Sequence, residues 1–179
     1  MRPIVPGIGT LAQHLKQIKE APETYRPERC PHCGMAGVWC HGVYTGKSDR
    51  EGRGGDCLNP VPIPRFYCRH CRRTCSALPE SIPARRWYLW SIQQAAMFLW
   101  LAGISIEKTA EQVLPSADTV WRWRSRLRTC FSEYGFHLRR HDAQWGVHQR
   151  LKSLWRAVLA ELSLSQVMCL LHQSGVFVP

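Results

Sequence analysis

The chain has 179 residues, of which 45% are hydrophobic, and a formal net charge of +11 from 24 Lys and Arg against 13 Asp and Glu. This length suits one compact unit or two small ones, and the hydrophobic fraction is too high for a disordered chain. The positive charge fits a polyanionic partner such as nucleic acid, with a solvated basic surface as the alternative interpretation.

No apolar stretch at the amino end is long enough for a signal peptide, and the longest apolar run, residues 95–106, is too short to cross a bilayer. We therefore expect a cytoplasmic protein that makes no contact with a membrane. The chain has nine cysteines. In the reducing cytosol, paired cysteines more often hold a metal than form disulfides.

In chain order, the pattern predicts a mainly α fold with a small β zinc ribbon. Leu11, Leu15 and Ile18 have helical spacing and predict one short helix near the amino end. The predicted segments are a leader or arm with that helix (1–29), a four-cysteine zinc ribbon (30–80), a helix-turn-helix DNA-binding domain (81–130), and C-terminal helices that complete the core or oligomerise (131–179).

The ribbon segment contains a glycine-rich polar stretch, residues 47–60, which predicts a loop. Residues 61–67 then read as a short strand. Because proline cannot donate to a sheet ladder, Pro62 and Pro64 predict that this strand lies at the edge of its sheet.

Two C-x-x-C pairs are the strongest motif in the chain: Cys30 with Cys33, and Cys68 with Cys71. Two such pairs bring four thiolates around one ion, and Gly34 can take the positive φ that a tight turn needs. Four thiolates fill a tetrahedral zinc site and leave no open position. We therefore expect one structural Zn²⁺ and no catalytic metal.

The remaining cysteines and nearby histidines allow an alternative, a second metal site, although no further pair has C-x-x-C spacing. Cys130 and Cys169 fall on helical patterns and are more simply core residues. The residues available for a second site are Cys40, His41, Cys57, Cys75, His32 and His70.

Residues 103–128 predict a helix-turn-helix. Ser105 can cap a helix over 106–114, Pro115 interrupts it, and Ser116 can cap the next helix. The side chains expected to form the shared core are Val113, Val120, Trp123 and Leu127.

In this motif the amino-terminal part of the second helix enters the major groove of DNA. Arg122 could pair with guanine, whereas Arg124, Arg126 and Arg128 are expected to meet phosphates. The alternative is an ordinary helical hairpin with a solvated basic face. The residues predicted to contact DNA are Ser116, Ala117, Asp118, Trp121, Arg122, Arg124, Ser125, Arg126 and Arg128.

The order of these parts resembles the amino-terminal region of bacterial insertion-sequence transposases. The matching residues are 30–34, 65–74, 78–88 and 103–123, about half of the chain. The resemblance implies binding to transposon-end DNA or regulation of transposition. Such transposases also need a sheet domain with three carboxylates, and no such set follows the predicted third helix. We therefore expect an accessory protein, a reading-frame partner or a truncated remnant, and not an enzyme.

After residue 130, Gly135 and Gly146 are expected to break the chain into short pieces. Residues 149–175 are nearly neutral and carry a Leu, Val and Trp stripe. The stripe either completes the helical core or forms a homodimer or partner contact.

Three functions are compatible with these features, and DNA-binding titrations at several salt concentrations would separate them. The first is sequence-specific binding of double-stranded DNA, linked to a mobile element. The second is a protein-interaction adaptor within a larger transposition or nucleoprotein assembly. The third is an enzyme such as a nuclease, which the shortage of clustered His, Asp and Glu disfavours.

Overall fold

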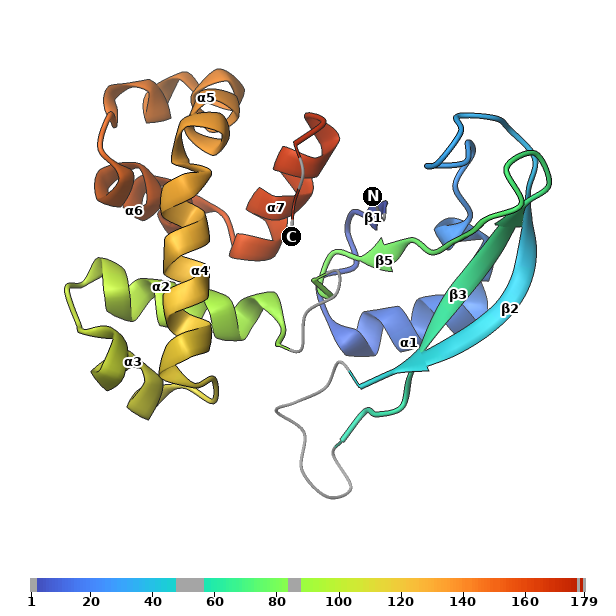
Figure 1. Cartoon of the computed structure of the whole chain (residues 1–179), viewed down its shortest axis with the longest axis horizontal. Helices are drawn as coiled ribbons and strands as arrows, with labels where there is room; N and C mark the ends of the chain where they lie inside the picture. Colours follow the sequence, from blue (N-terminus) through green and yellow to red (C-terminus); the bar gives the residue numbers. More distant parts are fainter. Residues whose placement is uncertain (1–2, 48–56, 84–87, 177, 179) are drawn as a thin grey trace. The chain divides into compact units, whose positions relative to one another are not determined.

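The structure is a computed structural model that describes residues 3–47, 57–83, 88–176 and 178. About half of the chain is helical, and the remainder includes two small sheets. The chain divides into two compact units, an amino-terminal unit (Met1–Leu89) and a helical unit (Trp90–Val178) (Figure 1). Each unit has its own buried apolar residues.

In its described residues, the amino-terminal unit combines one α-helix and one 3₁₀-helix with two sheets. Strands β2, β3 and β4 form an antiparallel sheet with β3 in the middle, and β1 pairs in parallel with β5. Most of the polar loop expected at 47–60 lies outside the described residues. The elements are β1 (Ile4–Val5), α1 (Leu11–Glu20), a 3₁₀-helix (Pro22–Tyr25), β2 (Val38–Gly46), β3 (Val61–Cys68), β4 (Thr74–Cys75) and β5 (Leu78–Pro79).

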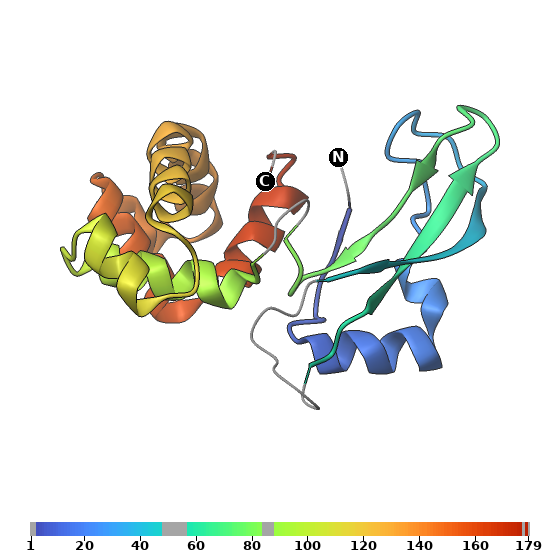
Figure 2. The same cartoon turned by 60° about the horizontal axis from the view of Figure 1, so that its bottom comes forward.

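Helix α1 is the short helix expected near the amino end. Thr10 and Gln13 form a reciprocal capping box at its start, and Leu11 packs with Val61 and Ile63 of β3. Figure 2 shows α1 along one side of the β2–β3 ribbon. The residues expected as a leader or arm therefore help to build the core of this unit.

His14 is a buried polar residue at the centre of this packing, with no exposed surface. Its Nε2 lies 2.9 Å from the carbonyl oxygen of Pro62, and its Nδ1 lies 2.6 Å from Tyr25 Oη. Because a carbonyl can only accept, Nε2 carries the proton and Tyr25 donates to Nδ1. Burial lowers the pKa of His14, so the ring is held neutral.

Strand β3 is the central strand of its sheet, so the prediction that residues 61–67 form an edge strand is wrong. Pro62 and Pro64 face β2 residues on one side only. The second neighbour, β4, pairs only with Phe66 and Tyr67, beyond both prolines. Proline has no N–H to donate to a neighbouring strand. Pro62 and Pro64 lie where β3 has a single partner strand, so both can be accommodated although β3 is not an edge strand.

The helical unit is built from six α-helices and a 3₁₀-helix around one cluster of buried side chains. In Figure 1, α4 is the long helix that runs between α3 and α5. Its packing partners include α2, α3 and α5. The elements are α2 (Trp90–Leu101), α3 (Ile106–Gln112), α4 (Ala117–Thr129), α5 (Phe131–His141), a 3₁₀-helix (Ala143–Val147), α6 (Leu151–Glu161) and α7 (Leu164–Gln173).

Gly135 does not break the chain, contrary to the prediction; it lies inside α5. It is buried, and a Cβ at this position would come within 2.9 Å of the Arg139 side chain. The Arg139 guanidinium therefore lies over the position that a side chain at residue 135 would occupy. Gly146 lies within the 3₁₀-helix.

The apolar stripe of residues 149–175 is buried in the core of the helical unit. Leu154, Trp155 and Val158 of α6 and Val167 and Leu171 of α7 have no exposed surface. Packing within the unit therefore occupies this stripe, and a homodimer or partner contact through 149–175 stays a prediction. Among the described residues, no single helix is long and apolar enough to cross a membrane; only the bent pair α6 and α7, at 103°, reaches that length together.

Candidate metal centre and nucleic-acid interface

The two C-x-x-C pairs form matching turns. Cys30 N donates to the carbonyl of Met35 over 2.8 Å, and Cys68 N donates to the carbonyl of Arg73 over 3.0 Å, five residues on in each case. The residue after each pair has a positive φ, +73° at Gly34 and +55° at Arg72. The positive φ expected at Gly34 is confirmed, and the second turn uses an arginine in the same conformation.

These turns bring four sulfur atoms together. The Sγ atoms of Cys30 and Cys71 are 3.7 Å apart, as are those of Cys33 and Cys68. All four sulfur atoms lie within 4.8 Å of one another, so they could hold one metal ion. Within the described ranges, no other group of three His, Cys, Asp or Glu side chains is as close, and the residues considered for a second site do not form one there.

Electrostatics within the cluster favour a cation. Peptide N–H groups of Cys71 and His70 lower the pKa of Cys68 to about 7. Burial, followed by the neighbouring sulfurs, raises the pKa of Cys71 to about 12. Thiolates at this spacing repel one another, so all four can ionise together only with positive charge between them.

Two of the residues considered for a second site lie around the first. Cys75 is buried near the cluster, where desolvation raises its pKa to about 11. His32 turns its Nε2 towards the carbonyl oxygen of Thr74, at 3.3 Å. Neither side chain belongs to the group of four sulfurs that could hold a metal ion.

The second candidate site is the pair α3 and α4. Ser105 caps α3 by accepting from Lys108 N, and the chain turns between Gln112 and Ala117. Ser116 is the N-cap residue of α4, but its side chain contacts Thr119 Oγ1, at 3.2 Å, and does not cap a peptide N–H. The buried side chains of α4 are Val120, Trp123 and Leu127.

The opposite side of α4 is exposed. Asp118, Trp121, Arg122 and Arg128 are exposed, with Trp121 57% exposed, and Ser125 is half-buried between them. Arg122 Nε donates to the carbonyl of Asp118 over 3.2 Å, which holds the guanidinium along the helix. These side chains, spaced three or four residues apart, form one stripe along the helix.

The four arginines of α4 divide into two pairs. Arg122 and Arg128 are exposed, whereas Arg124 and Arg126 are half-buried. The Arg124 guanidinium lies 5.5 Å from the centre of the Trp100 ring. Arg126 lies beside Tyr134, whose pKa burial raises to about 12. Half of the predicted arginine surface is therefore engaged with the unit's own side chains.

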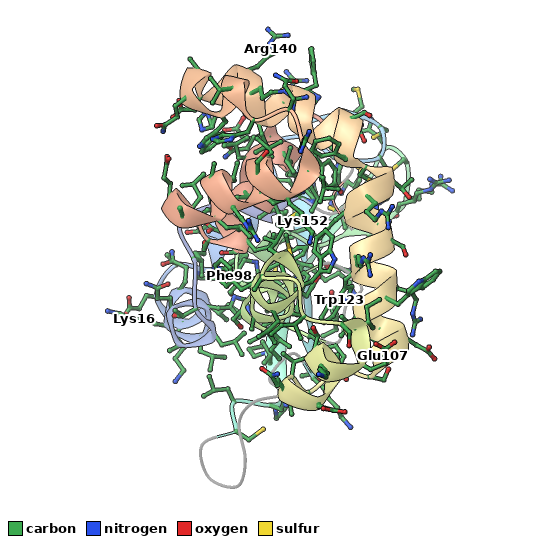
Figure 3. The ribbon with its side chains drawn as sticks, turned by 90° about the vertical axis from the view of Figure 1, so that its left-hand side faces the viewer. Lys16, Phe98, Glu107, Trp123, Arg140 and Lys152 are labelled. Carbon is green, nitrogen blue, oxygen red and sulfur yellow. The ribbon has the colours of Figure 1, made fainter. Side chains whose placement is uncertain are left out.

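Trp123 marks the buried side of α4. In Figure 3 it lies on the side of α4 that faces the other helices, and it is 7% exposed. Ala117, at the first turn, is half-buried. The residues predicted to contact DNA thus lie on or directly before α4, but only some of them are on its exposed side.

No family model, curated protein or solved structure matches this chain.

Sequence reasoning missed a further set of exposed side chains on the three-stranded sheet. Trp39, on β2, is 49% exposed, and Tyr67 is its register partner on β3. Arg69 follows directly after β3 and is exposed. The sequence feature that could have revealed this set is the polar and apolar alternation of residues 65–69. In it, Arg65, Tyr67 and Arg69 flank the buried Phe66 and Cys68.

Proposed function

We propose that this protein is a sequence-specific double-stranded DNA-binding protein with one structural zinc ion. In this proposal the cysteine turns form a zinc ribbon, and α3 and α4 form a helix-turn-helix whose second helix enters the major groove. The proposed role is that of a transposon-associated accessory or regulatory factor that recognises element-end DNA. The residues that carry it are the four cysteines and the exposed stripe of α4.

The spacing of the sulfurs supports zinc. A tetrahedral ion with Zn–S bonds of about 2.3 Å places its ligands about 3.8 Å apart. The Sγ atoms of Cys30 and Cys71, and those of Cys33 and Cys68, are 3.7 Å apart. Four sulfur ligands complete the coordination and leave no position for water, so the ion would be structural.

Metal analysis of the purified protein tests this part. We expect about one zinc per chain, lost in Cys68→Ser and retained in Cys40→Ser. Cys40 is the matched control because it is an exposed cysteine of the same unit, outside the cluster. Full zinc content in Cys68→Ser would contradict the four-ligand site.

The single observation that carries the DNA proposal is the two-sided character of α4. One side buries Val120, Trp123 and Leu127, and the other exposes Arg122 and Arg128. A helix anchored on one side, with arginines on the other, can present their donors to base edges and phosphates.

Selection of bound duplexes from a random pool, followed by variants, tests this reading. Arg122→Ala should weaken binding to the selected sequence by about 1–3 kcal/mol, with little change on random duplex. Arg128→Ala, the matched control on the same face, should weaken both sequences alike because a phosphate contact carries no sequence information. Equal losses in Arg122→Ala would contradict base reading by Arg122.

Exposed apolar side chains favour a second candidate, a protein-interaction adaptor. Leu114 is 54% exposed in the turn before α4, close in sequence to the exposed Trp121. A titration against salt separates the two functions. A DNA binder loses affinity with a slope of about −0.9 per phosphate neutralised, whereas an adaptor would bind DNA weakly and without sequence preference.

The link to transposition rests on the resemblance of the sequence motifs. The same selection experiment tests it. We expect the selected duplex to match the terminal repeats of a mobile element. A selected sequence with no such relation would leave DNA binding intact and contradict the role in transposition.

A further inference from the structure

Next to the cysteine turns, the three-stranded sheet has one covered side and one open side. Val38, Phe66 and Cys68 cluster with Ile18 of α1 on the covered side, while the side chains of Trp39 and Tyr67 alternate with these buried neighbours and point away from it. Figure 2 shows α1 beside one side of the β2–β3 ribbon. The open side carries a set of aromatic and basic side chains, here called the ring face: Trp39, His41, Tyr67 and Arg69.

Two ring stacks organise the ring face. The Arg69 guanidinium lies 3.9 Å from the centre of the Trp39 ring. The rings of His41 and Tyr67 are 5.6 Å apart and tilted by 35°. Trp39 and Tyr67 are opposite one another in the β2–β3 register, so the two stacks are neighbours.

A bulge in β2 sets this arrangement. The register with β3 shifts between Cys40 and Val43, and Gly42 within the bulge has a φ of +79°. A bulge re-aims the side chains beside it. At this position it accompanies the placement of His41 against Tyr67, on the neighbouring strand.

The charged residues of the two segments that carry the ring face are all basic. Residues 30–47 and 57–79 contain no Asp or Glu. The cations in these ranges are Lys47, Arg65, Arg69, Arg72 and Arg73. A zinc ion with four thiolates carries two net negative charges, so the balance of this region stays positive. The combination of ring surfaces with positive charge is complementary to a nucleic-acid strand.

We propose that the ring face binds unpaired bases of single-stranded DNA. Every unpaired base has a free π surface that can stack on an aromatic ring or on a guanidinium plane, and its phosphates are attracted by nearby arginines. Bases inside a duplex are already stacked on one another, so their π surfaces are not available to these rings. The ring face is therefore a second nucleic-acid surface, independent of the duplex-binding role proposed for α4.

Fluorescence anisotropy with a labelled 20-nucleotide oligo(dT) and a labelled duplex of equal length tests the proposal on the full zinc-loaded chain. Trp39→Ala and Arg69→Ala should each weaken oligo(dT) binding by about tenfold, the usual size of one base-stacking contact. Duplex affinity should change less than twofold. Val43→Ala, an exposed side chain of the same strand, should change neither.

Conservative variants keep the test decisive. Trp39→Phe retains a ring and should keep most of the oligo(dT) affinity, whereas Trp39→Leu retains apolar surface without a ring and should lose it. Zinc content confirms that each variant is folded around its metal. Because Arg122→Ala should weaken binding to its selected duplex and leave oligo(dT) binding unchanged, the two proposals fail separately.

Three outcomes would overturn the proposal. The first is wild-type oligo(dT) affinity in Trp39→Ala and Arg69→Ala. The second is an equal loss on single-stranded and duplex DNA, which would indicate simple phosphate attraction. The third is equal binding by Trp39→Leu and Trp39→Phe, which would indicate an apolar protein contact.

Discussion

The two units of this chain reach a folded state by different physical routes. The helical unit gathers most of its buried apolar residues into one continuous cluster that includes Trp90, Trp145 and Trp155. The amino-terminal unit divides its buried residues between two smaller clusters, and Cys30 and Cys68 belong to one of them. The four-cysteine cluster is thus part of the core in one unit and has no counterpart among the described residues of the other.

The difference follows from how much apolar surface each sequence offers. Small domains bury a small fraction of their surface, so a structural metal often supplies the stability that their core cannot. The sequence between the cysteine pairs is rich in glycine, proline and arginine, whereas α6 and α7 bury several leucines and valines. We therefore expect the two units to respond oppositely to metal removal and to core substitution.

Removal of the metal should have the largest effect. Binding of zinc to a structural site contributes roughly 10–16 kcal/mol of apparent free energy, comparable with or above the total stability of a typical domain. A chelator should therefore unfold the amino-terminal unit and leave the helical unit folded. Hydrogen exchange with mass spectrometry, read separately for peptides of each unit, checks this.

Cys169→Ser is the matched control for that experiment, because Cys169 is a buried free cysteine of the helical unit. It should leave the response to chelator unchanged. Loss of protection in both units on chelation would contradict independent cores.

Leu154→Ala should produce the reverse pattern. Leu154 has no exposed surface, and truncation of a buried leucine costs about 2–5 kcal/mol. We expect a lower free energy of unfolding for the helical unit and an unchanged zinc content, measured by denaturant titration and metal analysis. Val147→Ala, at a side chain that is 78% exposed, should be neutral. A drop in zinc content with Leu154→Ala would show that the units fold as one.

Mild acid should affect the amino-terminal unit through His14. Burial lowers the folded-state pKa of His14, while the unfolded chain titrates near 6.5. As the pH falls below about 6.5, the unfolded state binds more protons than the folded state, so stability falls until the folded-state pKa is passed. One such group gives at most about 1.4 kcal/mol per pH unit.

His14→Gln, which cannot titrate, is the variant that checks this. Free energies of unfolding measured between pH 7.5 and 6.0, with zinc content followed in parallel, should show a smaller slope in the variant. An identical slope in both proteins would assign the acid sensitivity to groups other than His14.

Local sequence signals predicted the parts of the sites that depend on short-range geometry. The C-x-x-C spacing placed four sulfurs together, and Ser105 and Ser116 marked the first turns of α3 and α4. These features are decided within a few residues of the chain. That α3 and α4 bind DNA stays a prediction.

Long-range packing decided what the sequence could not predict. Arg126 reads as a surface cation from its spacing, but it is half-buried and lies beside Tyr134 of the next helix. His14 lies three residues after Leu11, on the apolar face of the predicted helix, but only the folding of Pro62 and Tyr25 around it reveals what its ring contacts. Strand β2 carries no clear alternation because the bulge at Cys40–Val43 interrupts the period.

The smallest expected effect compares the two cysteine turns with each other. Gly34 and Arg72 occupy equivalent positions, with φ of +73° and +55°. A non-glycine residue in this conformation costs about 1–2 kcal/mol, and a Cβ at Gly34 would meet no atom within 4 Å. Gly34→Ala should therefore weaken zinc binding by about tenfold through backbone conformation alone.

Arg72→Gly should act in the opposite direction, because it relieves the same backbone cost in the second turn. The gain should be below 1 kcal/mol, since glycine also increases the conformational freedom of the unfolded chain. Competition with a zinc-binding dye measures both variants, as zinc affinity and folding of this unit are coupled. Changes of the same sign in the two variants would mean that the turns are not equivalent, and that the Arg72 side chain contributes interactions which outweigh its backbone strain.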